Sequence, residues 1–230
     1  DVGSDIKKIV AGFHDKMCAC EMGGKNALIV LDDANLDIAV NAAIISAFKT
    51  SGQRCTSASR FIVHEKVLGE FEKRFVETTK RLRIGNPLDE DIFMGPVINQ
   101  AATEKITRYN ELAKKEGAKV LLDGGRLTDE SHKKGYFMSP FVYRMQNNPK
   151  SRVLHEEVFG PHVAIIPVKS IDEAIEVHND TDYGLSCAVI TEDFRKARRI
   201  RDDCEYGLGY VNLPTIGAEV HLPFGGVKKS

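Results

Sequence analysis

Residues 26–64 read NALIVLDDANLDIAVNAAIISAFKTSGQRCTSASRFIVH, and this stretch decides the fold. It starts with a short apolar run at 26–31, which is typical of a buried strand. Apolar residues at helical spacing follow from Asn35 to a break at Ser51 and Gly52, and a second β-rich run occupies 60–64. A strand, a helix and a strand in this order predict two parallel strands joined by a crossover helix.

The same alternation continues along the rest of the sequence. Further strands are expected at 119–122, 140–145, 162–168, 185–191 and 209–212, and further helices at 66–82, 101–116, 171–179 and 194–204. A first helix is expected behind Ser4, whose hydroxyl would cap it. The pattern therefore predicts an α/β fold, with a mostly parallel sheet and flanking helices. Because ligands of such sheets bind beyond the carboxyl ends of the strands, we expect the functional residues at that edge.

The composition argues against several classes of partner. The 32 Lys and Arg residues balance 33 Asp and Glu residues, which leaves a formal net charge of −1 and no electrostatic basis for binding nucleic acid or an anionic membrane. The apolar runs are shorter than the roughly 20 residues that span a bilayer. We therefore expect neither nucleic acid nor membrane as a partner. Five cysteines without a C-x-x-C pair predict reduced thiols in the cytoplasm, and no targeting segment is visible.

Two segments carry residue types suited to chemistry. Residues 20–26 (CEMGGKN) place the carboxylate of Glu21 before two glycines, which permit a sharp turn. Residues 51–57 (SGQRCTS) place the thiol of Cys55 in a polar break next to Arg54. A free cysteine is only about 3% thiolate at pH 7, so a nucleophilic Cys55 needs a cation or backbone dipoles nearby. On these residues alone, a packed thiol is the favoured interpretation of Cys55 over a nucleophile, and the plain interpretation of Glu21 is a strand-end carboxylate exposed to water.

Four motifs together resemble those of the NAD(P)-dependent aldehyde dehydrogenases. The segments at 20–26 and 51–57 resemble the active-site Glu and Cys motifs of that family, in the family's order. Residues 156–161 (EEVFGP) resemble its cofactor segment, and Asn212 with residues 222–230 (LPFGGVKKS) resembles its last motif. The motifs extend over nearly the whole chain, so the resemblance implies an aldehyde-dehydrogenase-like catalytic domain.

The resemblance also implies roles for single residues. Cys55 would attack the aldehyde to give a thiohemiacetal, and hydride transfer to NAD or NADP would leave a thioester. Glu21 would activate the water that hydrolyses this thioester. Phe224 and Arg54 would lie at the substrate. The residues implied to bind the cofactor are Ser4, Met22, Gly23, Glu157 and Phe159.

The domain organisation is likewise implied by the resemblance. Residues 1–21 would be the tail of a cofactor-binding domain that this chain otherwise lacks, and residues 22–230 would be the catalytic domain. We expect such a fragment to bind NAD weakly and to oxidise little aldehyde by itself, and the full-length enzyme to be a homo-oligomer. We expect no metal site, because the histidines never recur at i and i+4.

Three alternatives remain open on the sequence. A related enzyme transfers the acyl group to coenzyme A instead of water, although the presence of Glu21 favours hydrolysis. A cysteine-dependent acyl or ester hydrolase would need no cofactor, but no Cys–His pair is evident. A non-catalytic binding protein would need neither Glu21 nor Cys55. Arg54 and His221 suggest a semialdehyde that carries a carboxylate, whereas the sequence alone favours an Arg54 that points into a packed or solvated interface.

Overall fold

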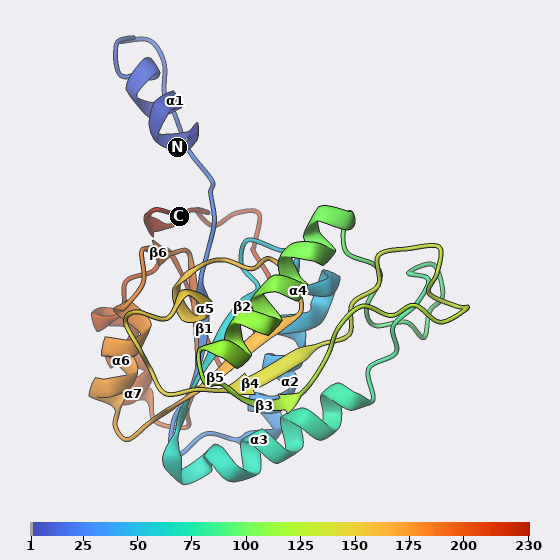
Figure 1. Ribbon diagram of the computed structural model, residues 1–230. Helices are drawn as coiled ribbons and strands as arrows, with labels where there is room; N and C mark the ends of the chain where they lie inside the picture. Colours follow the sequence, from blue (N-terminus) through green and yellow to red (C-terminus); the bar gives the residue numbers. More distant parts are fainter. Residues whose placement is uncertain (1) are drawn as a thin grey trace.

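The computed structural model describes residues 2–230, which form a seven-stranded sheet covered by helices on both faces (Figure 1). The strand order is β3-β4-β5-β2-β1-β7-β8, and every neighbouring pair is parallel except β3 and β4. The strands are β1 (Asn26–Val30), β2 (Ala58–His64), β3 (Lys119–Leu122), β4 (Phe141–Arg144), β5 (His162–Val168), β7 (Ser186–Ile190) and β8 (Leu208–Val211). A separate antiparallel ribbon pairs β6 (Tyr183–Gly184) with β9 (Val227–Lys228).

The two faces of the sheet carry different helices. One face packs against α2 (Leu36–Phe48) and α3 (Glu65–Lys80). The other packs against α4 (Gln100–Lys115), α5 (Arg152–His155), α6 (Ile171–Asn179) and α7 (Phe194–Asp203). Side chains alternate between the faces along a strand, so Leu28 and Val30 join the first core and Ala27 and Ile29 the second. Both faces are therefore buried, which explains why β1 is apolar throughout.

Four phenylalanines consolidate the core beneath α2 and α3. Phe61 of β2 meets Phe75 edge to face at 5.0 Å and Phe71 at 6.0 Å between ring centroids. Phe48, at the end of α2, stacks on Phe75 at 5.8 Å. Such pairs add about 0.5–1.5 kcal/mol each beyond the burial of their area. They fix the end of α2, from which the chain turns toward β2.

The expected α/β fold is confirmed, and the differences are local. The expected strand at 185–191 is β7, whereas the two-residue β6 and the short helices α5 and η1 (Lys49–Gly52) fall outside the expected elements. Strand β3 is antiparallel to its neighbour, because a loop rather than a crossover helix connects it to β4. Helix α1 (Val2–Val10) begins before Ser4, which therefore lies inside the first turn and does not cap it. No residue of α1 is buried, and the helix stands clear of the sheet in Figure 1.

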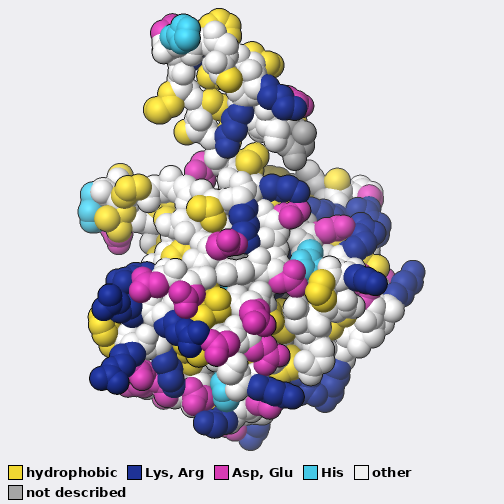
Figure 2. All heavy atoms as spheres, turned by 90° about the vertical axis from the view of Figure 1, so that its left-hand side faces the viewer, with side chains coloured by type: hydrophobic (Ala, Val, Ile, Leu, Met, Phe, Trp, Pro, Cys, Tyr) yellow, Lys and Arg dark blue, Asp and Glu magenta, His cyan; other side chains and the backbone are white. Residues whose placement is uncertain are grey.

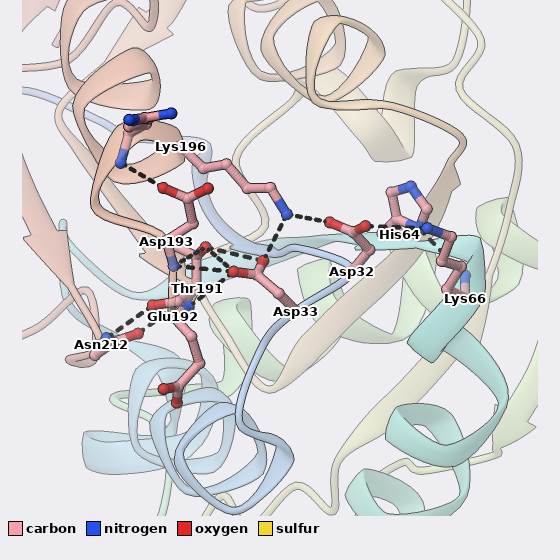
Figure 3. A network of polar contacts seen from close by, with 10 residues as sticks. Asp32, Asp33, His64, Lys66, Thr191, Glu192, Asp193, Lys196 and Asn212 are labelled. Atoms are coloured by element: carbon pink, nitrogen blue, oxygen red, sulfur yellow. Dashed lines mark hydrogen bonds and ion pairs between the residues drawn. The ribbon is translucent and has the colours of Figure 1, made fainter.

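The expectation that the motifs lie at the carboxyl edge of the sheet is wrong for three of the four motifs. Residues 21–25 precede β1, Cys55 precedes β2 and Glu157 precedes β5, so these motifs meet at the amino ends of the parallel strands. The physical reason is that polar contacts between protein groups occupy the carboxyl ends of β1 and β7 (Figure 3).

Asp33 is the centre of those contacts. Its carboxylate accepts hydrogen bonds from the Thr191 hydroxyl (2.8 Å) and from the backbone nitrogens of Glu192 (3.1 Å) and Asp193 (2.9 Å). Lys196 adds an ion pair at 3.0 Å. The network joins the turns after β1 and β7, which leaves their carboxyl ends occupied by protein groups (Figure 3).

Asn212 of the last motif lies at this same carboxyl edge. Its Oδ1 accepts from the backbone nitrogen of Thr191 and its Nδ2 donates to the Thr191 carbonyl, both at 3.0 Å. Its φ of 54° lies in the left-handed region, which asparagine tolerates better than most residues. Asn212 therefore terminates β8 and fixes its end to β7.

Opposite charges are interspersed over the surface. Figure 2 shows Lys and Arg side chains next to Asp and Glu over the face it presents. Within residues 2–230, no helix is long and apolar enough to cross a bilayer.

A buried histidine makes the stability of the fold depend on pH. His178, at the end of α6, is 3% exposed, and its Nε2 lies 3.4 Å from the Glu205 carbonyl oxygen. Burial, followed by the nearby Arg60 guanidinium, lowers the pKa of His178 to about 3. Between about pH 3 and pH 6.5 the imidazole is therefore neutral in the folded protein, whereas the unfolded chain protonates it.

We expect the wild-type chain to lose stability relative to the variant His178→Gln as the pH falls from 7 to 5. The unfolded chain binds a proton at His178 near pH 6.5 and the folded chain does not, so acid favours unfolding. The difference between the two free energies of unfolding should change by about 2 kcal/mol over this interval. Urea unfolding at the two pH values measures it, and parallel curves for the two proteins would contradict the prediction.

Candidate active site

The two glycines before β1 allow the chain to pass closely between two other segments. The Gly24 nitrogen donates to Glu157 Oε1 at 2.8 Å. A Cβ atom on Gly23 would lie 3.0 Å from Glu157 Oε2 and 3.1 Å from the Tyr183 ring, and one on Gly24 would lie 2.6 Å from the Cys55 carbonyl oxygen. Side chains at these two positions would therefore separate the three motif segments that meet here.

Asn26 ties the loop that carries Cys55 to the sheet. Its Nδ2 donates to the carbonyls of Cys55 (2.6 Å) and Ser57 (3.0 Å), and its Oδ1 accepts from the Ser186 nitrogen at 2.9 Å. The side chain is buried, so these bonds form away from water. Asn26 lies within the quoted motif but was not singled out from the sequence. The sequence feature that could have indicated its role is a polar residue at the first position of a buried strand.

The turn before Cys55 has an unusual backbone. Thr50 and Ser51 both have φ of 56° and Gly52 has φ of 67°, so three consecutive residues are left-handed. Each non-glycine residue in this region costs about 1–2 kcal/mol. The Ser51 hydroxyl offsets part of this cost by donating to the Gly95 carbonyl at 2.8 Å. Strain of this kind is common at functional sites, where it fixes one geometry.

Gly52 also brings this turn against the segment of Glu157. A Cβ atom there would lie 2.6 Å from the Gly160 carbonyl oxygen and 2.8 Å from that of Ala47. Gln53 adds a second link, because its Nε2 donates to the Phe159 carbonyl at 3.2 Å. The loop of Cys55 and the segment 157–160 are therefore in direct backbone contact.

A narrow crevice lies between these two segments. Arg54, Ser57, Glu157 and Phe159 line it, together with Gly24, Gly52 and residues 58, 59, 158 and 160. Cys55 is half-buried beside it and its thiol is free, while Arg54 is exposed and donates from Nε to the Thr50 hydroxyl at 2.9 Å. Phe159 has φ of 62° and is 38% exposed. The structure thus brings Cys55, Arg54, Glu157 and Phe159 to one edge of the sheet.

The remaining predicted site residues lie around this edge or away from it. Glu21 is exposed, and its Oε1 would lie 3.5 Å from a Cβ atom on Gly225, next to the last motif. Met22 packs its thioether against the backbone of α1 at residue 3. Ser4 is exposed on α1. Phe224 is 43% exposed and lines a different pocket of about 510 Å³ with Leu213 and Leu222.

A buried lysine holds the Glu157 segment in place. Lys25 is 2% exposed, and its Nζ donates to the carbonyls of Val153 (2.8 Å) and Glu156 (2.7 Å). Glu156 and Glu157 are consecutive residues, so the ammonium group fixes the backbone from which the Glu157 carboxylate reaches Gly24. The sequence motifs assigned no role to Lys25. A lysine that follows two glycines and directly precedes an apolar strand nevertheless indicates a buried position.

A second buried cation supports the first. The Arg60 guanidinium donates to the carbonyls of Lys25 (3.0 Å), Val177 (2.9 Å) and His178 (3.1 Å). Burial, and then Arg60, lowers the pKa of Lys25 to about 7, whereas Glu157 and Glu156 act in the opposite direction. Burial lowers the pKa of Arg60 to about 10. Both cations are thus held chiefly by backbone carbonyl groups.

The hydrogen-bonding groups at Glu157 are better suited to the hydroxyl groups of a ribose than to a metal ion. One carboxylate oxygen faces the Gly24 nitrogen, and the half-buried Gly23 leaves beside the other a space that a Cβ atom would fill. Glu157 also borders an open pocket of about 700 Å³, lined among others by His155, Asn179 and Tyr183. Among residues 2–230, no group of three or more His, Cys, Asp or Glu side chains is arranged to hold a metal ion.

Comparisons with known proteins agree with this geometry. The sequence pattern that defines the aldehyde dehydrogenase family matches residues 1–230 of this chain. A 1-pyrroline-5-carboxylate dehydrogenase of Bacillus licheniformis is 43% identical over 218 residues, which are 94% of this chain and 41% of the relative. An alpha-ketoglutaric semialdehyde dehydrogenase of Bacillus subtilis is 38% identical over 91% of this chain and 43% of the relative.

A solved structure shows the same arrangement of elements. The betaine aldehyde dehydrogenase of Staphylococcus aureus in complex with NAD+ superposes with a TM-score of 0.92 at 34% identity. The match covers 99% of this chain and 45% of that protein. The chain therefore spans less than half the length of these relatives.

We expect the pH dependence of stability to reveal the lowered pKa of the buried Lys25. Between pH 7 and pH 9 the unfolded chain keeps the Lys25 proton while the folded chain releases it, so raising the pH favours folding. The wild-type chain should gain roughly 1–2 kcal/mol relative to Lys25→Met over this interval.

Urea unfolding of both proteins at the two pH values measures this difference. Lys134→Met, which removes an exposed lysine from the loop between β3 and β4, is the matched control and should follow the wild-type curve. Equal pH slopes for the wild-type chain and Lys25→Met would show that folding does not lower the pKa of Lys25.

Proposed function

The chain belongs to the aldehyde dehydrogenase family, and on this premise we propose that it is the catalytic part of an enzyme that oxidises an aldehyde to a carboxylic acid with NAD or NADP. In this proposal residues 22–230 form the catalytic domain and residues 1–21 are the tail of a cofactor-binding domain. The exposed α1, joined to the sheet by a linker without regular structure, supports this division. So does the match to less than half of each relative.

The observation that carries the proposal is the meeting of the Cys55 loop, the Gly23–Gly24 turn and Glu157 at one edge of the sheet. Cys55 would add to the aldehyde carbon, and its own backbone N–H would donate to the oxygen that becomes negative. The loop is already fixed by Asn26, so little reorganisation precedes attack. Glu21, which is exposed, would later take a proton from the water that cleaves the thioester.

The residues at this edge fit the ribose of a nicotinamide cofactor, which when bound would accept the hydride that leaves the thiohemiacetal. The Glu157 carboxylate can accept hydrogen bonds from ribose hydroxyls while Gly24 and Lys25 hold it in position. The absence of a side chain at Gly23 leaves room beside the second carboxylate oxygen. Phe159, 38% exposed on the same segment, offers an apolar surface to a ring. Met22 and Ser4 complete the proposed cofactor contacts on the side of α1.

The substrate in this proposal is a semialdehyde that carries a carboxylate. Arg54 directly precedes Cys55 and is exposed, so its guanidinium is available to an anion. Relatives named for 1-pyrroline-5-carboxylate and for alpha-ketoglutaric semialdehyde support the same class. Phe224 would contribute an apolar wall from the last motif, which also approaches Glu21 through Gly225.

We also propose a cytoplasmic location and self-association of the full-length enzyme. The five cysteines are free thiols, which suits a reducing cytoplasm. Strand β8 lies at an edge of the sheet with Val211 48% exposed, which supports self-association of the full-length enzyme.

Pre-steady-state kinetics of the full-length enzyme separate the two catalytic roles. Cys55→Ala should abolish aldehyde-dependent NADH formation, with a fall on the order of 10³-fold or more, because no covalent adduct can form. Glu21→Gln should keep the first turnover of NADH and slow later turnovers by about 10²–10⁴-fold, because only thioester hydrolysis needs the base. Rapid-mixing absorbance of NADH measures both.

Cys204→Ala is the matched control, because it removes another thiol at the far end of α7 and should leave both phases unchanged. Release of acyl-coenzyme A in place of free acid would favour the coenzyme A branch. Ester hydrolysis without any NADH from an aldehyde would contradict the proposal and favour the hydrolase.

Specificity is expected to depend on Arg54. Arg54→Met should raise the KM for a carboxylate-bearing semialdehyde by about 10–100-fold, since a charge-assisted hydrogen bond contributes about 1.5–3 kcal/mol. Its KM for an uncharged aldehyde of similar length should stay within about twofold. Steady-state assays of the full-length enzyme measure both, and an equal loss for the two substrates would show that Arg54 only supports the loop through Thr50.

A further inference from the structure

Cys18 and Cys20, neither of which is the proposed catalytic cysteine, bring their sulfur atoms into contact. Cys18 and Cys20 occupy alternate positions in the linker between α1 and β1, and their Sγ atoms are 3.5 Å apart. Cys20 Sγ also lies 3.8 Å from the Gly3 carbonyl oxygen, which holds it near the start of α1. Both side chains are half-buried, so each remains in reach of a small reagent.

Closure of this pair requires only a small movement. A disulfide bond is about 2.0 Å long and accepts Cα separations of about 4.4–6.8 Å. Two residues of fully extended chain span about 6.6–7.2 Å, at the upper limit of that range, so the bond forms only where the backbone at Ala19 departs from full extension. Ala19 is exposed and lies in no helix or strand, so it can bend without breaking a ladder of hydrogen bonds.

We propose that Cys18 and Cys20 form a redox-active dithiol, which a disulfide or diazene oxidant converts to an intramolecular disulfide. One thiolate attacks the oxidant and forms a covalent adduct, and the second thiolate then attacks that sulfur and expels the reduced oxidant. With a diazene, the two thiols lose two electrons and two protons, and the N=N bond becomes HN–NH. With a disulfide oxidant, the same electrons and protons yield two small thiols.

The environment of the pair sets how readily it reacts. The pKa of the Cys18 thiol is raised, first by its hydrogen bond with Cys20 and then by burial, so the reaction accelerates above neutral pH. A bridge between residues i and i+2 is strained by the bend it imposes, and strained disulfides are easily reduced. The pair is thus suited to reversible rather than structural use.

Because Cys18 and Cys20 lie next to the proposed catalytic base, formation of the disulfide should affect catalysis. This consequence rests on the proposed function. Cys20 directly precedes Glu21, the proposed base, and Met22 packs against α1. A bend at Ala19 changes the direction in which the chain arrives at Glu21. Closure should therefore slow thioester hydrolysis and leave the attack by Cys55 unaffected.

Peptide mapping of the 230-residue chain tests the site without any assay of activity. Trypsin cleaves after Lys16 and Lys25, so the peptide MCACEMGGK holds both cysteines and no other. After treatment with diamide at pH 8 and alkylation, this peptide should be found two hydrogens lighter and unalkylated. Treatment with a reductant before alkylation should return it doubly alkylated.

Two variants make the result specific. Cys18→Ser and Cys20→Ser should each give a singly alkylated or mixed-disulfide peptide and never the lighter form. Recovery of the doubly alkylated wild-type peptide after oxidation, or of Cys18 or Cys20 joined to another cysteine or a second chain, would overturn the inference. Failure of aldehyde oxidation in the full-length enzyme would instead overturn the proposed function, since the mapping does not depend on it.

Discussion

The architecture of this edge of the sheet depends on two buried cations whose partners are backbone carbonyls. Lys25 binds the carbonyls at the end of α5, and Arg60 binds those at the end of α6, where helix dipoles present negative partial charge. Burying two positive charges is costly unless such partners are fixed in advance. Because Arg60 also holds the Lys25 carbonyl, the start of β1 is fixed from both sides.

Much of the fold could be predicted because it depends on local patterns. The strand at 26–31 and the helix behind Asn35 were predicted to within a residue or two, since burial on both faces and an N-cap leave clear traces in the sequence. The antiparallel direction of β3 could not be predicted, because it depends on the connection to β4 and not on a local pattern. The two-residue strand β6 could not be predicted, because so short a strand has no period of its own. The early start of α1 shows that a good capping residue does not exclude helix before it.

The residues of the candidate site could be predicted from the sequence. Their position at the amino ends of the strands could not. The thiol and carboxylates could be named from their motifs, whereas the contacts that hold them join distant parts of the chain. Lys25 reaches carbonyls 128 and 131 residues away, and Asn26 reaches the nitrogen of a residue 160 positions on. The general rule for parallel sheets failed for three of the motifs. The network of Asp33 occupies the carboxyl ends of β1 and β7, while Gly23 and Gly24 allow the motif segments to pack closely at the amino ends.

The contact between Gly52 and Gly160 has a mechanical consequence. Backbone meets backbone there, so no side-chain rotamer can absorb a displacement at this point, and the Gln53 side chain adds a hydrogen bond between the same two loops. Thermal motion of one loop is therefore transmitted to the other, so the sulfur of Cys55 and the carboxylate of Glu157 are displaced in concert. The spacing between them should fluctuate less than either position does relative to the rest of the molecule.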